Sequence, residues 1–268
     1  MTIHPTAIVD RRAELDASVE VGAYAIIEAD VRIGAGTRIW PHAYVARYTT
    51  LGARCQVHPF AVVGHLPQDV KYRDAPSYAE VGDDTVVREH ATIHRATEPD
   101  SRTIVGARCL LMSTAHVAHN CVVADDVIMA NGALLGGHTR VGPRAFLSGN
   151  CAVHQFTRVG ELAMIGGGAM VVGDVPPFMT VLGRAVVGLN VIGMRRAGVS
   201  AAERDELRRA FQTLYRGHYP WRRAVVEVTT RCQTPAGRRL ADFLGTPARR
   251  GFLHGVRPLG QPDAGDSA

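Results

Sequence analysis

The sequence lacks a run of apolar residues long enough to span a bilayer, for which roughly 20 would be needed. It also lacks a basic and hydrophobic leader, since its first ten residues read MTIHPTAIVD. These absences argue against membrane-spanning and exported proteins. We therefore expect a cytoplasmic protein with no transmembrane segment.

Lysine is almost absent. Lys71 is the only lysine among 30 basic residues, and the others are all arginine. A chain that avoids lysine elsewhere would keep this one where a compact point charge is needed, although a chance survivor of drift towards arginine is the alternative. Lys71 is therefore a candidate functional residue.

An aliphatic residue recurs every six positions over most of the chain. The repeat runs from Ile3 to Val63, from Val81 to Ile93 and from Val105 to Val171. Helices repeat near 3.6 residues and strands near 2, so neither element alone explains a period of six. One short strand and one turn per hexad do explain it, with three hexads closing a triangular coil of 18 residues. Such a fixed period predicts a solenoid.

The cysteines follow the same repeat. Cys55, Cys109, Cys121 and Cys151 each take the hexad position that is otherwise filled by small or β-branched residues, four after an aliphatic one. This pattern predicts small core side chains in a reducing compartment rather than disulfides, metal ligands or nucleophiles. Cys232 lies outside the repeat and carries no signal.

The hexads resemble the left-handed parallel β-helix of the hexapeptide acyltransferases, whose crossovers break the usual right-handed rule. We thus expect a mainly β fold, followed by a small C-terminal α-helical domain that opens with a capping box at Ser200 and Glu203. The predicted divisions are a β-helix over 1–177 with inserted loops at 64–80 and 98–104, an irregular connector over 178–199, a helical domain over 200–254 and a disordered tail over 255–268.

Positive charge gathers in the C-terminal part, where Arg195 to Arg257 includes fourteen arginines against five acidic residues. There is no nucleic-acid-binding motif, so we expect no nucleic-acid partner. An acidic protein and a nucleotide diphosphate would be attracted equally well.

Several histidines fall on one face of the predicted coil. Residues 18 apart stack at about the 4.8 Å spacing of neighbouring strands. With Val117, Leu135 and Val153 equivalent, one column holds His119, Gly137 and Gln155. The flanking columns and the preceding strand add His138, His154 and His94. Imidazole suits general base catalysis, and a glycine leaves its N–H open to a substrate oxygen.

Two other interpretations of this cluster stay open. A zinc-dependent hydratase like the gamma-class carbonic anhydrases is one, although His116 and His119 have a shorter spacing than the H-x4-H pair associated with that family. Structural histidines at the interface of a non-catalytic binding trimer are the other.

A closer resemblance rests on seven segments, GHLPQDVKY, ATIHRAT, AHVAHNC, LGGHTRVG, VHQF, DVPPF and GLNVIGMRRAG. Their order and spacing are similar to those of the UDP-N-acetylglucosamine O-acyltransferases of lipid A biosynthesis, over nearly the whole chain. The resemblance implies a homotrimer with active sites between adjacent subunits. It implies transfer of an (R)-3-hydroxyacyl chain from acyl carrier protein to the 3-hydroxyl of UDP-N-acetylglucosamine, the first step of lipid A biosynthesis, without metal or cofactor.

The resemblance also implies roles for individual residues. His119 would be the general base, and the Gly137 N–H would stabilise the oxyanion. Asp69 and Lys71, assisted by Gln68, would hold the acyl or sugar group from the neighbouring subunit. Gly167 would set the acyl length and, without a side chain, admit a longer chain. The remaining substrate-binding residues would be His94, His116, Asn120, His138, His154 and Gln155 near the sugar and diphosphate, and Asn190 and Arg196 at the nucleotide.

The sequence departs from the family pattern in three places. Asn120 stands where an aspartate usually follows the catalytic histidine, so either His119 is a weaker base or another carboxylate serves. The segment 183–190 is about two residues shorter than its counterpart, and Ile192 replaces a glutamate. N-acyl transfer to a 3-amino analogue of the same sugar is the alternative within this chemistry. The later N-acyltransferase of the pathway is disfavoured, because the repeat begins at Ile3.

Overall fold

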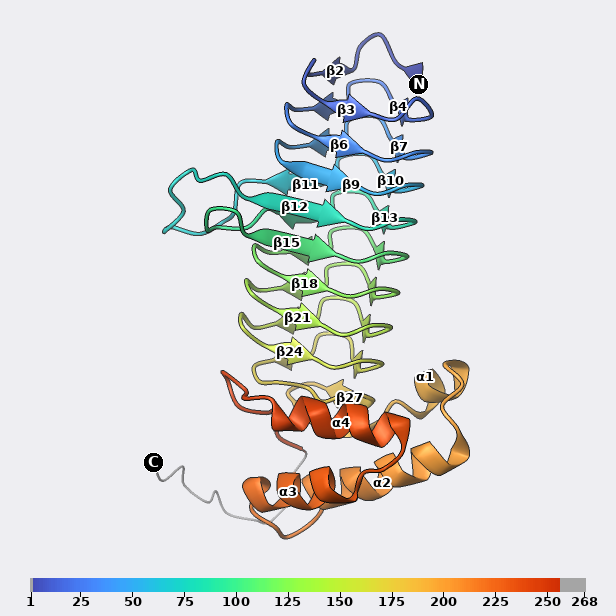
Figure 1. Cartoon of the computed structure of the whole chain (residues 1–268), viewed down its shortest axis with the longest axis vertical. Coiled ribbons are helices and arrows are strands. Elements are labelled where there is room, and N and C mark those ends of the chain that lie inside the picture. Colours follow the sequence, from blue (N-terminus) through green and yellow to red (C-terminus); the bar gives the residue numbers. More distant parts are fainter. Residues whose placement is uncertain (1, 256–268) are drawn as a thin grey trace.

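The computed structural model describes residues 2–255, and the expected tail over 255–268 falls outside the described residues from 256 onwards. Three parallel sheets wind around one axis as a left-handed parallel β-helix, and helices follow at its C-terminal end (Figure 1). The mainly β fold with a small helical part is confirmed.

Each coil contributes one strand to each of the three sheets, which we name A, B and C. Sheet A contains β1 (Thr2–Ile3), β4 (Glu20–Val21), β7 (Arg38–Ile39), β10 (Gln56–Val57), β13 (Val86–Val87), β16 (Leu110–Leu111), β19 (Ile128–Met129), β22 (Phe146–Leu147), β25 (Met164–Ile165), β27 (Met179–Leu182) and β28 (Ala185–Leu189). Sheet B contains β2 (Ile8–Val9), β5 (Ile26–Ile27), β8 (Tyr44–Val45), β11 (Val62–His65), β14 (Thr92–His94), β17 (His116–Val117), β20 (Leu134–Leu135), β23 (Ala152–Val153) and β26 (Met170–Val171). Sheet C contains β3 (Glu14–Leu15), β6 (Arg32–Ile33), β9 (Thr49–Leu51), β12 (Tyr78–Val81), β15 (Arg102–Val105), β18 (Val122–Val123), β21 (Arg140–Val141) and β24 (Arg158–Val159).

The register agrees with the hexad count. Val117 pairs with Leu135 and Leu135 with Val153, while Ile93 precedes Val117 in the same column. At most corners the chain turns through a residue with positive φ, such as Asn120 at 58° and His138 at 59°. Asparagine tolerates this left-handed conformation better than most residues.

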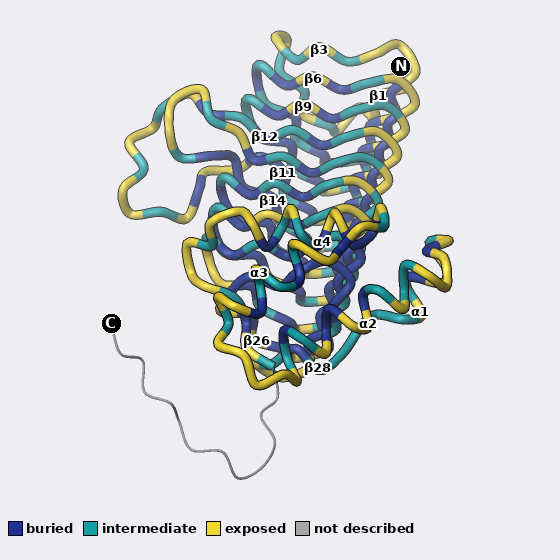
Figure 2. Tube along the Cα trace, turned by 60° about the horizontal axis from the view of Figure 1, so that its bottom comes forward, coloured by how far each residue is buried: buried dark blue, intermediate teal, exposed yellow. Residues whose placement is uncertain are grey.

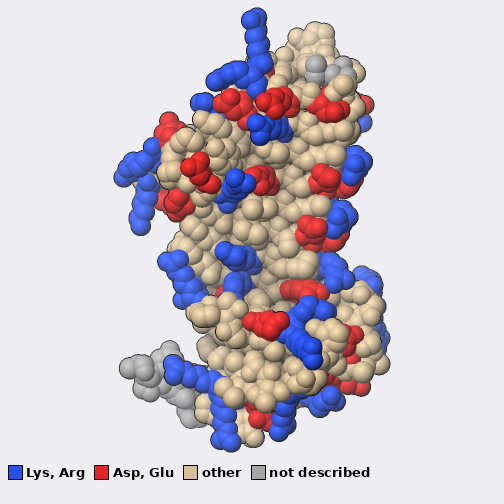
Figure 3. All heavy atoms as spheres, viewed as in Figure 1, with Lys and Arg blue, Asp and Glu red and all other residues tan. Residues whose placement is uncertain are grey.

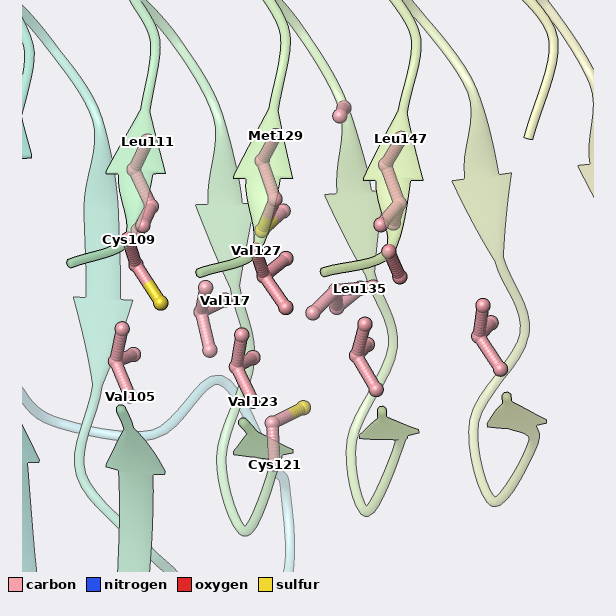
Figure 4. Close-up of a cluster of buried hydrophobic side chains, with 14 of the residues drawn as sticks. Val105, Cys109, Leu111, Val117, Cys121, Val123, Val127, Met129, Leu135 and Leu147 are labelled. Atoms are coloured by element: carbon pink, nitrogen blue, oxygen red, sulfur yellow. The ribbon is translucent and has the colours of Figure 1, made fainter. Parts of the chain in front are cut away.

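The aliphatic residue of each hexad points into a narrow core. Figure 4 shows Leu111, Met129 and Leu147 along one wall, with Cys109 and Cys121 among the side chains that fill the interior. All four hexad cysteines are buried, as predicted. Figure 2 shows the same contrast along the chain, since the strands carry buried positions while the turns and loops are largely exposed.

Two loops leave the coils at the same corner, between sheets B and C, and project together from the side of the molecule (Figure 1). The first was predicted over 64–80, but it spans 66–77 because β11 continues to His65 and β12 begins at Tyr78. The second was predicted over 98–104, but it spans 95–101 because β15 begins at Arg102 and pairs with β12 from there. Extra pairing next to the loops therefore moves their boundaries.

The expected irregular connector over 178–199 is wrong. After the two prolines, β27 rejoins sheet A by pairing with β25, and the turn at Gly183, with φ of 59°, reverses the chain into antiparallel β28. The short helix α1 (Val191–Arg196) then follows. The prolines do not end the stack, because they precede the pairing residues of β27.

Three longer helices close the C-terminal end: α2 (Ala201–Tyr215), α3 (Trp221–Arg231) and α4 (Pro235–Gly245). The capping box between Ser200 and Glu203 is present, as expected. Arg158 fastens these helices to the β-helix: its Nε donates to buried Asp174 at 2.7 Å, and its Nη2 donates to the Thr246 carbonyl after α4 at 3.0 Å. No helix within residues 2–255 combines the length and hydropathy of a membrane span.

We predict that all five cysteines are unreactive in the folded protein. Burial raises the pKa of Cys121 to about 12 and that of Cys109, Cys151 and Cys232 to about 11, and it also raises that of Cys55. Few thiolates then exist at pH 8, and thiolate is the reacting form. Mass spectrometry after iodoacetamide treatment should detect no label, whereas all five cysteines should be labelled in denaturant. Rapid labelling of the native protein would contradict this.

Candidate active site

The histidine column lies at the corner between sheets B and C, beside the two inserted loops. His119 follows β17, Gly137 follows β20 and Gln155 follows β23, so the three belong to successive coils. The backbone N–H of His138 donates to the His119 carbonyl at 3.0 Å. The predicted stacking of the site is therefore present in the backbone.

His119 is nearly buried, with an exposed fraction of 9%. Its Nδ1 lies 2.9 Å from Oδ1 of Asn120, and its Nε2 lies 3.9 Å from a carboxylate oxygen of Asp69. Because an amide oxygen only accepts hydrogen bonds, this contact assigns the proton to Nδ1. Nε2 then carries the lone pair that a general base needs.

The imidazole of His119 lies directly against Gly137. A Cβ atom added at Gly137 would approach Cε1 of His119 to 2.5 Å and Nε2 to 2.6 Å. Among residues 2–255 the Gly137 N–H has no hydrogen-bond partner. Nε2 thus lies close to a residue whose backbone amide is free to donate, and acyl transfer requires a base near an oxyanion donor.

The neighbouring histidines resist protonation. Burial lowers the pKa of His94 to about 4, with a further effect from nearby His116, and leaves its Nδ1 without a partner within residues 2–255. Burial also lowers the pKa of His116 and of His138. Near neutral pH these side chains are therefore neutral groups that can both donate and accept hydrogen bonds.

The 66–77 loop reaches the site from within the same chain. Asp69 was expected to act from the neighbouring subunit, but it lies beside the His119 of its own chain. The Asp69 carboxylate also accepts a hydrogen bond from the backbone N–H of Lys71 at 2.8 Å, which shapes the loop. The side chains of Gln68 and Lys71 are exposed.

Other predicted site residues do not belong to the buried group around His119. His154 and Gln155 belong to the stacked corner but are exposed. Gly167 lies before β26, at the opposite edge of sheet B, with only the Gly149 carbonyl within 4 Å of an added Cβ.

The two residues predicted to bind the nucleotide are also separate from His119 within one chain. Asn190 forms the N-cap of α1, where its Oδ1 accepts from the Gly193 N–H and its Nδ2 donates to the Leu162 carbonyl, both at 2.9 Å. Its side chain thus already has a structural role. Arg196 is exposed at the end of the same helix.

Sequence reasoning missed several residues that support the site. Thr92 bonds Nδ1 of His116 at 2.7 Å. Buried Arg95 donates to the Tyr72 hydroxyl at 2.9 Å and so anchors the 66–77 loop. Glu98 accepts a hydrogen bond from Asn120 at 2.8 Å. Only the motif ATIHRAT pointed to this region, because it contains Thr92 and Arg95.

Within residues 2–255 of a single chain, no three His, Cys, Asp or Glu side chains are arranged to hold a metal ion. The zinc alternative therefore finds no complete ligand set in one chain.

Comparisons with known proteins identify the family of this chain. Residues 174–253 match the family model described as UDP-N-acetylglucosamine O-acyltransferase, domain 2. The acyl-[acyl-carrier-protein]–UDP-N-acetylglucosamine O-acyltransferase of Syntrophobacter fumaroxidans is 45% identical, and the match covers 94% of this chain and all of that protein. This chain belongs to the UDP-N-acetylglucosamine O-acyltransferase family.

Solved structures place the whole acyltransferase fold in the same family. The Moraxella catarrhalis UDP-N-acetylglucosamine O-acyltransferase is 35% identical, with a TM-score of 0.90 over 95% of this chain and 100% of that one. The Francisella novicida UDP-N-acetylglucosamine acyltransferase is 31% identical, with a TM-score of 0.91 over 94% of both chains. The protein is thus an acyltransferase.

We predict that Gly137→Ala lowers the kcat of this acyltransferase by about 100-fold, the scale of losing an oxyanion donor or misplacing the base. The added methyl group would collide with the His119 ring. Gly188→Ala is the matched control, because a Cβ there meets no atom within 4 Å. Steady-state kinetics of both variants would check this, and equal activity would contradict it.

Proposed function

We propose that this enzyme transfers an (R)-3-hydroxyacyl chain from acyl carrier protein to the 3-hydroxyl of UDP-N-acetylglucosamine. The names of its relatives support both substrates. The observation that carries the chemistry is the position of the His119 imidazole, with Nδ1 facing the Asn120 amide oxygen and Nε2 lying against Gly137.

In the proposed reaction, Nε2 of His119 removes the proton of the sugar 3-hydroxyl while that oxygen attacks the thioester carbonyl carbon. The carbonyl oxygen becomes an oxyanion that accepts a hydrogen bond from the Gly137 N–H. When the tetrahedral intermediate collapses, the C–S bond breaks and the ester remains on the sugar. The imidazolium returns its proton to the departing thiolate of the carrier.

Neutral histidines suit the sugar side of this reaction. Their lowered pKa values keep His94, His116 and His138 uncharged near pH 7, so they can bond hydroxyl groups in either sense. They also do not repel a transient imidazolium on His119, as protonated neighbours would. These neutral neighbours are therefore compatible with both the neutral and the protonated form of His119.

We further propose that the enzyme is a homotrimer in which sheet B faces a second copy. The outer positions of sheet B carry no charged residue: Ile8, Ile26, Tyr44, Val62, Thr92, His116, Leu134, Ala152 and Met170. On sheet C the equivalent positions include Glu14, Arg32, Arg140 and Arg158. An uncharged face with exposed Leu134 and Met170 favours burial against another protein surface.

A second copy would also complete the active site. Gly167 lies across sheet B from His119 of its own chain, so it can border an acyl chain held at His119 of a neighbour. The space around Gly167 supports a groove that admits a long chain. Asn190 and Arg196 would reach the nucleotide in the same way, with Asn190 keeping its role as a helix cap.

The helical end supports docking of the acidic carrier protein. Figure 3 shows basic side chains gathered around this end of the molecule. Exposed arginines on the helices include Arg209, Arg222 and Arg238. Such an excess of positive charge accelerates association with an acidic partner.

We predict a single product when the enzyme is given UDP-N-acetylglucosamine and a mixed pool of 3-hydroxyacyl carrier proteins. Mass spectrometry should detect one added 3-hydroxyacyl group whose bond is cleaved by mild alkali, as expected of an ester. His119→Ala should lower kcat by roughly 100-fold to 10,000-fold, whereas His218→Ala, in the exposed turn after α2, should not.

Three outcomes would contradict this proposal. An alkali-stable product formed only from the 3-amino sugar would establish N-acyl transfer instead. Full activity of His119→Ala, or stoichiometric zinc needed for turnover, would refute the proposed base.

We predict that Leu134→Arg disrupts the trimer. The substitution places a charge on the outer face of sheet B, where Leu134 is 44% exposed in the single chain. Analytical ultracentrifugation should show a monomer, and an acyl-transfer assay of this monomer should show little activity. Thr50→Arg, on the outer face of sheet C, is the control and should stay trimeric. An unchanged sedimentation coefficient for Leu134→Arg would refute the assigned face.

A further inference from the structure

Asn120 connects His119 to a carboxylate on the 95–101 loop. Its Oδ1 lies 2.9 Å from Nδ1 of His119, and its Nδ2 donates to Oε2 of Glu98 at 2.8 Å. The two bonds use opposite ends of one planar amide. A negative charge is thus joined to the imidazole through a single intervening side chain.

The partners of Asn120 fix the orientation of its amide. A carboxylate only accepts hydrogen bonds, so Glu98 selects the NH2 end. The backbone N–H of Thr97 donates to Oδ1 at 3.1 Å, and the Thr97 hydroxyl lies 2.9 Å from the same oxygen. The backbone N–H of Asn120 itself donates to Oγ1 of Thr103 at 2.7 Å. The amide therefore presents its oxygen to His119, which keeps the proton on Nδ1 and the lone pair on Nε2.

Glu98 is ionised near neutral pH. Burial raises the pKa of its carboxyl, but hydrogen bonds from Thr97 and Asn120 outweigh this effect and hold the pKa below its usual value. The carboxylate therefore supplies the charge that Asn120 lacks.

The other groups around His119 are on several elements. Asp69 approaches from the 66–77 loop, and His138 follows β20. His94 and His116 lie on sheet B and stay neutral near pH 7 because of their lowered pKa values. Asp69 is the carboxylate on the Nε2 side of the ring. Glu98 is the carboxylate linked to the Nδ1 side, through Asn120.

We propose that Glu98 is a positioning residue for acyl transfer, which acts through Asn120 to orient His119 and to stabilise its protonated form. The pair Asn120 and Glu98 replaces a carboxylate in direct contact with the histidine. This inference rests on the proposed role of His119 as general base. It adds a residue on an inserted loop to the catalytic machinery of the β-helix.

The test compares Glu98→Gln in two backgrounds. A glutamine oxygen can still accept from Nδ2 of Asn120, so the variant removes the charge and keeps the hydrogen bond. With Asn120 present, kcat should fall about 10-fold with little change in KM. In an Asn120→Ala background the hydrogen-bonded link between residue 98 and His119 is absent, so the same substitution should change kcat less than about twofold.

The pH profile gives a second readout that a purely structural role would not move. Without the negative charge the imidazolium is less stable, so the neutral base persists to lower pH. The acid limb of kcat/KM should therefore shift down by about 0.5 pH units in Glu98→Gln. Asn120→Asp should shift it up. Glu14→Gln, which removes an exposed charge on sheet C, should leave the limb unchanged.

The proposal is overturned if Glu98→Gln keeps both the kcat and the acid limb of the wild-type enzyme, or if it costs the same factor in both backgrounds. The second result would mean that Glu98 only holds the loop. Failure of the proposed function has a different signature, because His119→Ala would then remain active whatever residue 98 is.

Discussion

The closing of each coil after three hexads is the constraint on which the rest of the structure depends. Neighbouring coils can pair strand by strand only if every corner turns sharply, and residues with positive φ make most of these turns. Left-handed conformations cost roughly 1–2 kcal/mol for most L-residues, so the stacked strands and the packed core must outweigh that cost. Inside, the constraint leaves room for one aliphatic and one small side chain per hexad. Outside, it places corner side chains at regular heights.

The proposed active-site corner depends on this regularity and then departs from it. His119 lies against Gly137 because successive coils superimpose the same hexad position, and the glycine leaves room for the imidazole. The two carboxylates near His119 do not follow the repeat, because Asp69 and Glu98 lie on segments that leave the coils. At this corner the β-helix therefore supplies the imidazole and the glycine packed against it. The two loops supply the carboxylates on either side of that imidazole. Arg95, buried beneath the first loop, holds that segment in place.

Much of this could be predicted from the sequence because a period of six leaves little freedom. It located the buried cysteines, the pairing of Ile93, Val117 and Leu135, and the column of His119 and Gly137. It could not reach Glu98, because the path of an inserted loop depends on side-chain contacts and not on a repeat. The proline pair suggested an end of the stack, yet strand pairing resumes in β27. Asn190 shows the same limit, since its contact with the Leu162 carbonyl depends on the β27–β28 hairpin that precedes it.

The stacking register also determines which changes of chain length the fold can absorb. Where coils are uninterrupted, partners lie 18 residues apart, as Thr2 and Glu20 do. Deleting one residue there would turn every later aliphatic side chain of the coil out of the core, whereas deleting a whole coil would keep all contacts in phase. Between sheets B and C, by contrast, the spans 66–77 and 95–101 have no register to keep. Changes of length in these two loops would therefore leave the stack in phase, and the requirement on them is a different one, namely to keep Asp69 and Glu98 beside His119 and Asn120.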